Sequence, residues 1–269
     1  MSARHGANRH GDGSAGDADY GSIGCGYADY RRPDPRIESA IRRELGDAVT
    51  VLNVGAGAGS YEPLDREVTA IEPSESMRAQ RPASLSVAID ATAEKLPFAD
   101  RSFDASMATF TVHQWADLGE GLRELRRVTR GPVVILSCDP AALERFWLVE
   151  YAPEVIATEA RRYPDPALIA RELGGDTVLS EVPIPLDCTD GFGEAYYGRP
   201  EALLDPGARR ANSAWSFVAE EVVHRFEQTL GADLASGVWD ARHGSLRTRP
   251  EFDGSLRLVV SRPLTDLVG

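Results

Sequence analysis

Cysteine is scarce in this chain, and long apolar runs are missing. Only Cys25, Cys138 and Cys188 occur among 269 residues, far apart and odd in number. Such a set favours reduced thiols over a disulfide framework or a zinc site. No stretch approaches the roughly 18 apolar residues of a membrane span. Residues 1–26 also lack the apolar segment of a secretory signal, so we expect a cytoplasmic protein that does not bind membranes.

Positive charge is in short supply as well. Lys and Arg number 29 against 42 Asp and Glu, which gives a formal net charge of −13. A field of this sign repels nucleic-acid phosphates, so nucleic acid is not an expected partner. With 42% hydrophobic and 26% charged residues, the composition is that of an ordinary globular protein. We expect a small-molecule substrate and a monomer or homodimer.

Hydrophobic periodicity divides the chain into a tail and one domain. Residues 1–26 are rich in glycine and poor in aliphatic side chains, which predicts a flexible segment, and the domain is expected over 27–269. Short apolar runs alternate with helical patterns, as in βαβ units on a parallel sheet. The expected strands are Val49–Val54, Val68–Ile71, Leu85–Ile89, Phe103–Thr109, Val133–Ser137, Thr177–Ile184 and Ser255–Ser261. Helices are expected at Leu118–Thr129, Leu143–Leu173 with breaks at Pro164 and Pro166, and Ala214–Leu230.

A glycine-rich turn follows the first of these strands. The run Val51–Ser60 places glycines at 55, 57 and 59. Glycines allow a tight turn and a close approach of backbone to ligand at the carboxyl edge of the sheet. The second strand ends at Glu72, whose carboxylate can accept both hydroxyls of a ribose. Dinucleotide folds place a third glycine where Ser60 stands, so the spacing favours a ligand that carries a carboxylate instead of a pyrophosphate.

Further segments match one family in order and distance. They are Ala70-Ile71-Glu72-Pro73-Ser74, Ala93–Phe98 followed by Ser102-Phe103-Asp104, and Glu124–Val128. With the glycine turn, they resemble the class I S-adenosylmethionine (SAM)-dependent methyltransferases, in particular the small-molecule branch that includes ubiquinone/menaquinone and trans-aconitate methyltransferases. The resemblance spans residues 36–138.

The resemblance implies an α/β fold, a Rossmann-like seven-stranded and mostly parallel sheet flanked by helices, with a helical lid. The core would comprise 36–138, 176–184 and 253–262, and the lid with its substrate insertions 140–175 and 185–235. It also implies SAM as cofactor and S-adenosylhomocysteine (SAH) as product. The residues implied to hold SAM are Asn53, Gly55, Ala56, Gly57, Glu72, Pro73, Met77, Asp90, Ala91, Thr92, Ala93 and Thr109, with Tyr27, Tyr30 and Arg31 closing over it. Thr92 stands where the family usually has an acid near the adenine, and Asp90 is the residue that can compensate.

His113 is the candidate catalytic residue. It follows the fourth strand in Phe110–Trp115, which places it at the carboxyl edge beside the cofactor. An imidazole can deprotonate a phenol or enol near neutral pH, although His113 can equally serve only to line the pocket. Further substrate candidates are the aromatic residues Trp115, Trp147, Tyr151, Tyr196 and Tyr197; for the helix that carries Trp147, packing onto the sheet is at least as good an interpretation. No spacing of His, Cys or carboxylates indicates a metal.

The sequence therefore predicts a SAM-dependent methyltransferase that acts on a small hydrophobic metabolite, with oxygen or carbon as the preferred acceptor atom. Two alternatives stay open. One is an NAD-dependent oxidoreductase, which shares the strand, glycine and acid pattern. The other is a SAM-binding protein without catalysis, which the Thr92 departure allows.

Overall fold

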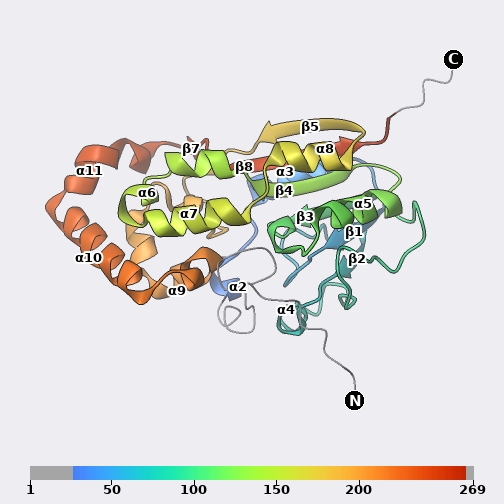
Figure 1. Cartoon of the computed structure of the whole chain (residues 1–269), viewed down its shortest axis with the longest axis horizontal. Coiled ribbons are helices and arrows are strands. Elements are labelled where there is room, and N and C mark those ends of the chain that lie inside the picture. The colour runs from blue at the N-terminus through green and yellow to red at the C-terminus, as the bar shows by residue number, and fades with distance from the viewer. Residues whose placement is uncertain (1–26, 265–269) are drawn as a thin grey trace.

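The structure, a computed structural model, describes residues 27–264. The predicted flexible tail, with Cys25, lies outside these residues, as does the side chain of Tyr27. Figure 1 shows an elongated molecule with a twisted sheet at one end and a cluster of helices at the other. Strands β1 to β5 and β8 form the sheet, and α6, α7, α9, α10 and α11 form the helical end, which we call the lid.

Six strands form the main sheet in the order β2-β1-β3-β4-β8-β5. The strands are β1 (Thr50–Val54), β2 (Glu67–Ile71), β3 (Ala105–Thr109), β4 (Val133–Cys138), β5 (Asp176–Glu181) and β8 (Leu256–Arg262). Strands β2, β1, β3 and β4 are parallel, whereas β8 runs antiparallel between β4 and β5. The carboxyl ends of the four parallel strands therefore share one edge, where ligands bind in open α/β sheets.

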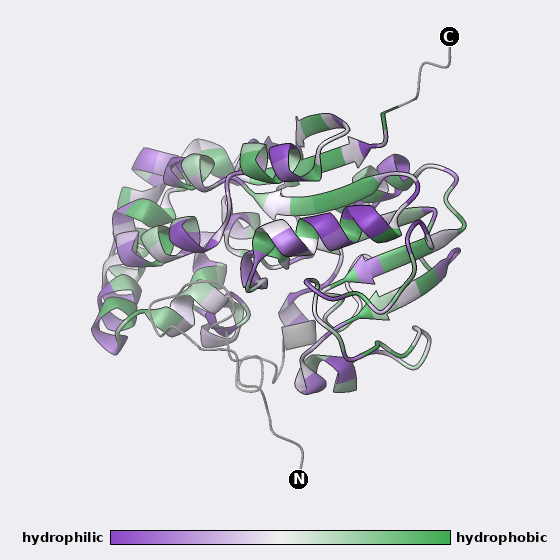
Figure 2. Ribbon diagram, turned by 45° about the vertical axis from the view of Figure 1, so that its right-hand side comes forward, coloured by the Kyte–Doolittle hydropathy of each residue, from purple (hydrophilic) through white to green (hydrophobic). Residues whose placement is uncertain are grey.

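Two helical layers cover this sheet. Every residue of β4 is buried, because Val133 and Ile135 face one layer while Val134 and Leu136 face the other. Helices α5 (Leu118–Val128) and α8 (Pro166–Leu173) pack on the first face. Helix α3 (Pro35–Leu45) covers the second, together with the lid. Figure 2 shows the resulting pattern, in which the strands are mainly hydrophobic and the helices carry mixed colours.

The expected α/β architecture is confirmed, with one strand fewer than expected. The segment Leu85–Ile89 makes only a single parallel bridge, from Ile89 to Ile71. Its Ser86 carbonyl accepts hydrogen bonds from the Arg81 guanidinium, and the Val87 side chain is 90% exposed. This segment is thus held by a side chain and by one bridge and not by a strand ladder, and the sheet ends at β2.

Short elements make up the lid and its connections. The helical region expected over 143–173 is divided into η2 (Pro140–Arg145), α6 (Leu148–Tyr151), α7 (Pro153–Arg162) and α8, with the break at the expected prolines. The helix expected at 214–230 is instead η5 (Ser213–Phe217) and α10 (Glu220–Ser236). The remaining elements are α2 (Tyr27–Tyr30), α4 (Glu75–Ala79), η1 (Val112–Gln114), β6 (Ile184–Pro185), η3 (Gly193–Tyr196), η4 (Pro200–Leu204), α9 (Pro206–Arg210), α11 (Val238–His243), η6 (Gly244–Thr248) and β7 (Glu251–Phe252).

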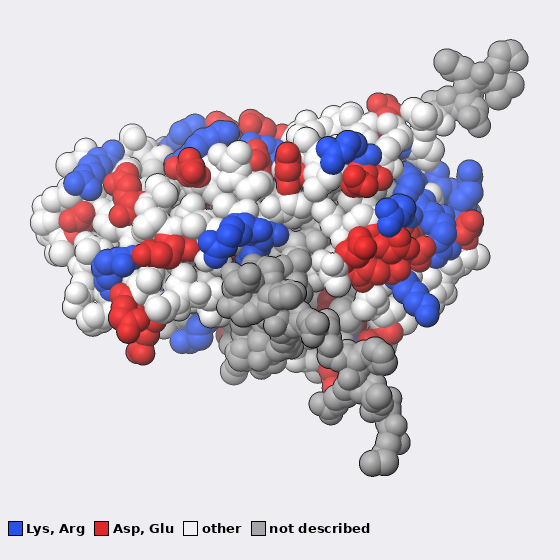
Figure 3. Space-filling view, in the orientation of Figure 1, with Lys and Arg blue, Asp and Glu red and all other residues white. Residues whose placement is uncertain are grey.

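The surface carries charges of both signs. Figure 3 shows acidic and basic side chains interspersed on the face in view, many of them side by side. Within residues 27–264, no helix is long and apolar enough to cross a bilayer. The same part of the chain holds no group of three or more His, Cys, Asp or Glu residues placed to bind a metal ion.

Candidate active site

The glycine turn after β1 adopts a conformation that few other residues tolerate. Gly55, Gly57 and Gly59 have φ values of 70°, 53° and 98°. The backbone N–H groups of Gly55 and Ala56 both donate to the carbonyl of Ile71 at 2.9 Å, which ties the turn to the end of β2. A Cβ on Gly55 would lie 1.9 Å from Oγ1 of Thr111. The turn therefore depends on glycine both for its dihedral angles and for its contact with the segment after β3.

Glu72 closes the other side of this turn. Its Oε2 accepts the N–H of Gly57 and its Oε1 the N–H of Ser74, each at 2.8 Å. The side chain is buried, and burial raises the pKa of the carboxyl, while the two backbone donors act in the opposite direction. Each carboxylate oxygen retains a lone pair, which fits an acceptor for the two hydroxyls of a ribose.

A buried polar network supports the turn from behind. Asn53 donates from Nδ2 to Glu62 at 3.0 Å, and Glu62 pairs with Arg81 at 2.8 Å, with the side chains of that ion pair almost fully buried. Asn53, expected to contact SAM, is thus engaged with Glu62. Met77 supports the turn directly, since its Cε would lie 3.3 Å from a Cβ on Gly57.

The other expected cofactor residues lie at the same edge with differing exposure. Asp90 is largely exposed and pairs with Arg78 at 3.2 Å, and Thr92 is exposed. Ala91 is half-buried and Ala93 is buried against the α5 side of the core. The remaining two are Pro73, exposed after β2, and Thr109, half-buried at the end of β3.

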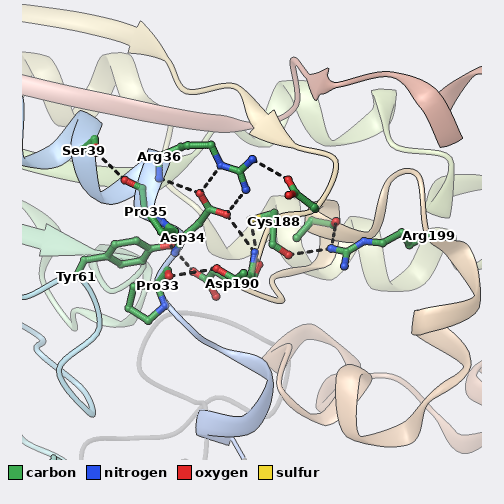
Figure 4. A network of polar contacts seen from close by, with 12 residues as sticks. Pro33, Asp34, Pro35, Arg36, Ser39, Tyr61, Cys188, Asp190 and Arg199 are labelled. Atoms are coloured by element: carbon green, nitrogen blue, oxygen red, sulfur yellow. Dashed lines mark hydrogen bonds and ion pairs between the residues drawn. The ribbon is translucent and has the colours of Figure 1, made fainter.

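The segment before α3 is fastened to a loop of the lid. Asp190 forms an ion pair with Arg31 and accepts a hydrogen bond from Tyr61 Oη at 2.8 Å. Asp34 accepts the N–H of Thr189 at 3.1 Å and pairs with Arg36 (Figure 4). Because Tyr61 directly follows the glycine turn, Asp190 connects that turn, the Arg31 segment and the lid. Tyr30, which donates to Asp205 at 2.7 Å, adds a further contact to α9.

A cavity lies between the edge of the sheet and the lid, next to this connection. It is partly open to solvent, and its empty space, including the solvent at its mouth, amounts to about 770 Å³. Aromatic side chains line much of it, from Phe110, Phe146, Phe192 and Trp215. Phe110 directly follows β3 and has a φ of 52°, a value that costs a bulky residue energy. The cavity therefore begins where β3 ends and extends into the lid.

His113 stands in the wall of this cavity. Its side chain is 4% exposed and its ring packs on Tyr163, with ring centroids 4.2 Å apart. Within residues 27–264, Nδ1 has no hydrogen-bond partner. Burial lowers the pKa of His113 well below its ordinary value, and the positive charges of Arg162 and Arg31 lower it further. The imidazole is therefore held in its neutral form.

Other ionisable groups share the cavity wall. Burial raises the pKa of the Glu194 carboxyl to about 7, although Ser255 donates to it from both its backbone N–H and its hydroxyl. Burial also raises the pKa of the thiol of Cys138 and of the phenol of Tyr163. The Cys138 thiol is accordingly no nucleophile at neutral pH. Cys138 and Cys188 are both free, as expected.

Of the expected substrate residues, the structure places only His113 on the cavity. Trp115 is buried beneath α5, against Gly121. Trp147 donates from Nε1 to the Tyr197 carbonyl, and Tyr197 stacks on Phe252. The other two are Tyr151, bonded to Asp233, and Tyr196, packed on Gly191.

Sequence reasoning missed Glu159, Tyr163 and Trp215, which do line the cavity. Val155, Glu159 and Tyr163 recur every four residues along α7 and its end, and this spacing puts them on one helix face. An acid and a tyrosine within an otherwise apolar stripe are the signal that was available.

Glu194 should make stability depend on pH. Its pKa is raised from 4.5 to about 7 in the folded state. The folded protein then binds this proton more tightly, so stability falls as pH rises from 4.5 to 7. At about 1.4 kcal/mol per pKa unit, the free energy of unfolding of the wild-type protein should fall by an amount on the order of 3 kcal/mol over this range. Glu194→Gln mimics the protonated form and should not show this fall. Denaturant titrations at pH 5 and pH 8 measure the effect.

Glu221→Gln, at an exposed position of α10, is the control and should retain the pH dependence of stability of the wild-type protein. The same pH dependence in Glu194→Gln would contradict the assignment.

Comparison with known proteins identifies the class. Residues 52–136, from β1 to β4, match the family described as a methyltransferase domain. This region contains the glycine turn, Glu72 and His113. Over these residues the chain is similar to a methyltransferase domain, and the expected resemblance to class I SAM-dependent methyltransferases is confirmed.

Individual relatives agree with this class. A malonyl-[acyl-carrier protein] O-methyltransferase of Erwinia pyrifoliae is 37% identical over 91 residues, which are 32% of this chain and 35% of the relative. The match thus spans about a third of that curated protein. A putative methyltransferase from an antibiotic biosynthesis pathway of Anabaena variabilis has a similar structure, with a TM-score of 0.80, 27% identity, and coverage of 86% of this chain and 98% of that one. A plantazolicin methyltransferase solved with SAH has a TM-score of 0.52 at 12% identity, covering 93% and 92% of the two chains, and shares the fold.

Proposed function

We propose that the protein transfers the methyl group of SAM to a small, largely apolar organic acceptor, at an oxygen or carbon atom. The observation that carries this proposal is the position of the cavity. It starts at Phe110 and His113, directly after β3, at the sheet edge that holds the glycine turn and Glu72. A cofactor at the turn and an acceptor in the cavity would meet at this point.

The residues at the turn suit SAM. Gly55 and Gly57 give the turn its positive φ angles and its close packing on Thr111 and Met77, and the buried carboxylate of Glu72 fits a ribose diol. When bound, SAM supplies an activated methyl group. The protein is then left to bind the acceptor, exclude water and remove a proton. Arg31, with Tyr27 and Tyr30 ahead of it, is proposed to close this side of the site.

The cavity suits an apolar acceptor. Its aromatic and aliphatic walls can enclose a ring system. The similar protein of Anabaena variabilis is described as a putative methyltransferase from an antibiotic biosynthesis pathway. The coverage of that relative extends over the lid as well as the sheet. The lid as substrate-binding unit, residues 140–175 and 185–235, is part of the same proposal.

Methyl transfer is tested by incubating the protein with SAM and a panel of phenols, enols, amines and carboxylic acids. Mass spectrometry then detects SAH and the methylated product. Release of SAH with at least one acceptor supports the proposal. Tight SAM binding without product on any acceptor favours the non-catalytic alternative, and calorimetric binding of NAD but not of SAM favours the oxidoreductase.

His113 is proposed as the general base. Once an acceptor has been identified, the His113→Gln substitution should lower kcat by a factor of about 10² to 10⁴, the usual contribution of proton transfer. The variant should leave KM within a few fold. His224→Gln, on the exposed side of α10, is the matched control and should match the wild-type protein. Unchanged kcat with altered KM would assign His113 to lining the pocket only.

A further inference from the structure

Helix α7 brings one carboxyl group to the cavity. Glu159 lies one turn from Val155 and one turn from Tyr163, and all three line the cavity. Many of the other side chains that line the cavity are apolar, among them Leu148, Ile156 and Trp215. A carboxylate among such neighbours is costly to bury unless a donor satisfies it.

Within residues 27–264, the Glu159 side chain makes no hydrogen bond, and no Lys, Arg or His lies within ion-pair distance of it. Burial raises the pKa of its carboxyl, while Arg162 and Arg31 act against this rise from further away. Glu194, the other acid of the cavity, differs, because Ser255 donates to both of its oxygens. Glu194 thus serves the structure, whereas Glu159 lines the cavity without a hydrogen-bond donor from the described part of the chain.

The same wall holds a second polar atom without a protein partner. The ring of His113 packs on Tyr163, which is one turn along from Glu159. Nδ1 of His113 is buried and unpaired within the described part of the chain. Two polar groups on one wall of an aromatic cavity fix the orientation of a bound molecule more sharply than apolar contact does.

We propose that Glu159 determines acceptor specificity by accepting a hydrogen bond from a hydroxyl or amino group on an otherwise apolar, ring-bearing acceptor. This inference deepens the proposed function and rests on it. A ligand without such a donor leaves the carboxylate unsatisfied, so the site rejects it.

Three naphthalene probes of equal shape test this proposal: 2-(aminomethyl)naphthalene, 2-(hydroxymethyl)naphthalene and 2-ethylnaphthalene. Calorimetry at pH 7.5 measures their binding to the full-length protein, both free and saturated with SAH. The variants are Glu159→Met, which removes the acceptor oxygens, and Glu159→Gln, which keeps one oxygen without the charge. Glu154→Met, at the exposed end of α7 where Glu154 pairs with Arg225, is the matched control. Circular dichroism confirms the fold of each variant.

The wild-type protein should bind the amine or the alcohol at least tenfold more tightly than the ethyl compound. Glu159→Met should abolish this preference and leave binding of the ethyl compound within threefold. In Glu159→Gln, the affinity for the amine should also fall at least tenfold, because the amine pairs with the carboxylate charge. The affinity for the alcohol should fall less than threefold in the same variant. Equal preference in wild type and Glu159→Met, or no binding of any probe, overturns the proposal. Because binding needs no turnover, these outcomes are distinct from a failure of methyl transfer. A protein that does not bind SAH would contradict the proposed function and not the role of Glu159.

Discussion

Glu72→Gln is expected to weaken binding of SAH by at least a hundredfold. Both oxygens of Glu72 accept backbone N–H groups, from Gly57 and Ser74. An amide must turn its NH2 group towards one of these donors, and it also loses the charge that would strengthen bonds to a ribose diol. Two weakened charge-assisted bonds amount to about 3 kcal/mol, or roughly a hundredfold.

Calorimetric titration with SAH measures this loss. Glu75→Gln is the matched control, since Glu75 is exposed on α4 three positions along and should bind SAH like the wild-type protein. An affinity of Glu72→Gln within threefold of wild type would remove Glu72 from the cofactor site. A loss of binding in both variants would point to a general disturbance of the region from β2 to α4.

Gly55→Ala is expected to destabilise the fold and to prevent SAH binding. The new methyl group would lie 1.9 Å from Oγ1 of Thr111, at a backbone φ of 70°. The φ angle costs about 1 to 2 kcal/mol for a non-glycine residue, and the collision adds about 1 to 3 kcal/mol of overpacking. Because relief of the collision must displace the turn, the ligand site would be lost with it.

Gly46→Ala separates these two effects. Gly46 has a φ of 57°, but a Cβ there meets no atom within 4 Å. The Gly46→Ala substitution should therefore destabilise the fold only by the cost of the φ angle and leave SAH binding intact. Thermal denaturation and calorimetry compare the two variants. If both lose the same stability and both bind SAH, the close packing between the glycine turn and Thr111 is of no consequence.

Local sequence patterns were enough to predict most of the candidate cofactor site. The glycine turn, Glu72 and the strands on either side depend on residues near in sequence, and the structure places them as expected. The strand expected at Leu85–Ile89 was wrong: the segment makes one bridge to β2, and Arg81 binds its backbone, a contact that no apolar pattern reveals.

The acceptor side was harder to predict because it is built from distant segments. Trp147 and Tyr197 have the composition of a substrate site but pack into the core, as large aromatic residues commonly do. Glu159 reaches the cavity only because of the way α7 packs on its neighbours α6, η2 and η5. Which face of α7 turns inward depends on tertiary contacts with η2 and η5 that the sequence does not display.

The placement of β8 bears on the order in which the sheet can assemble during translation. This strand pairs with β4 on one side and β5 on the other, yet it is the last of the six to leave the ribosome. Until residue 262 has emerged, the nascent chain presents two open strand edges where the finished molecule has a continuous ladder. Chaperone protection during this interval would be needed most at β4, whose six residues are all buried in the mature sheet.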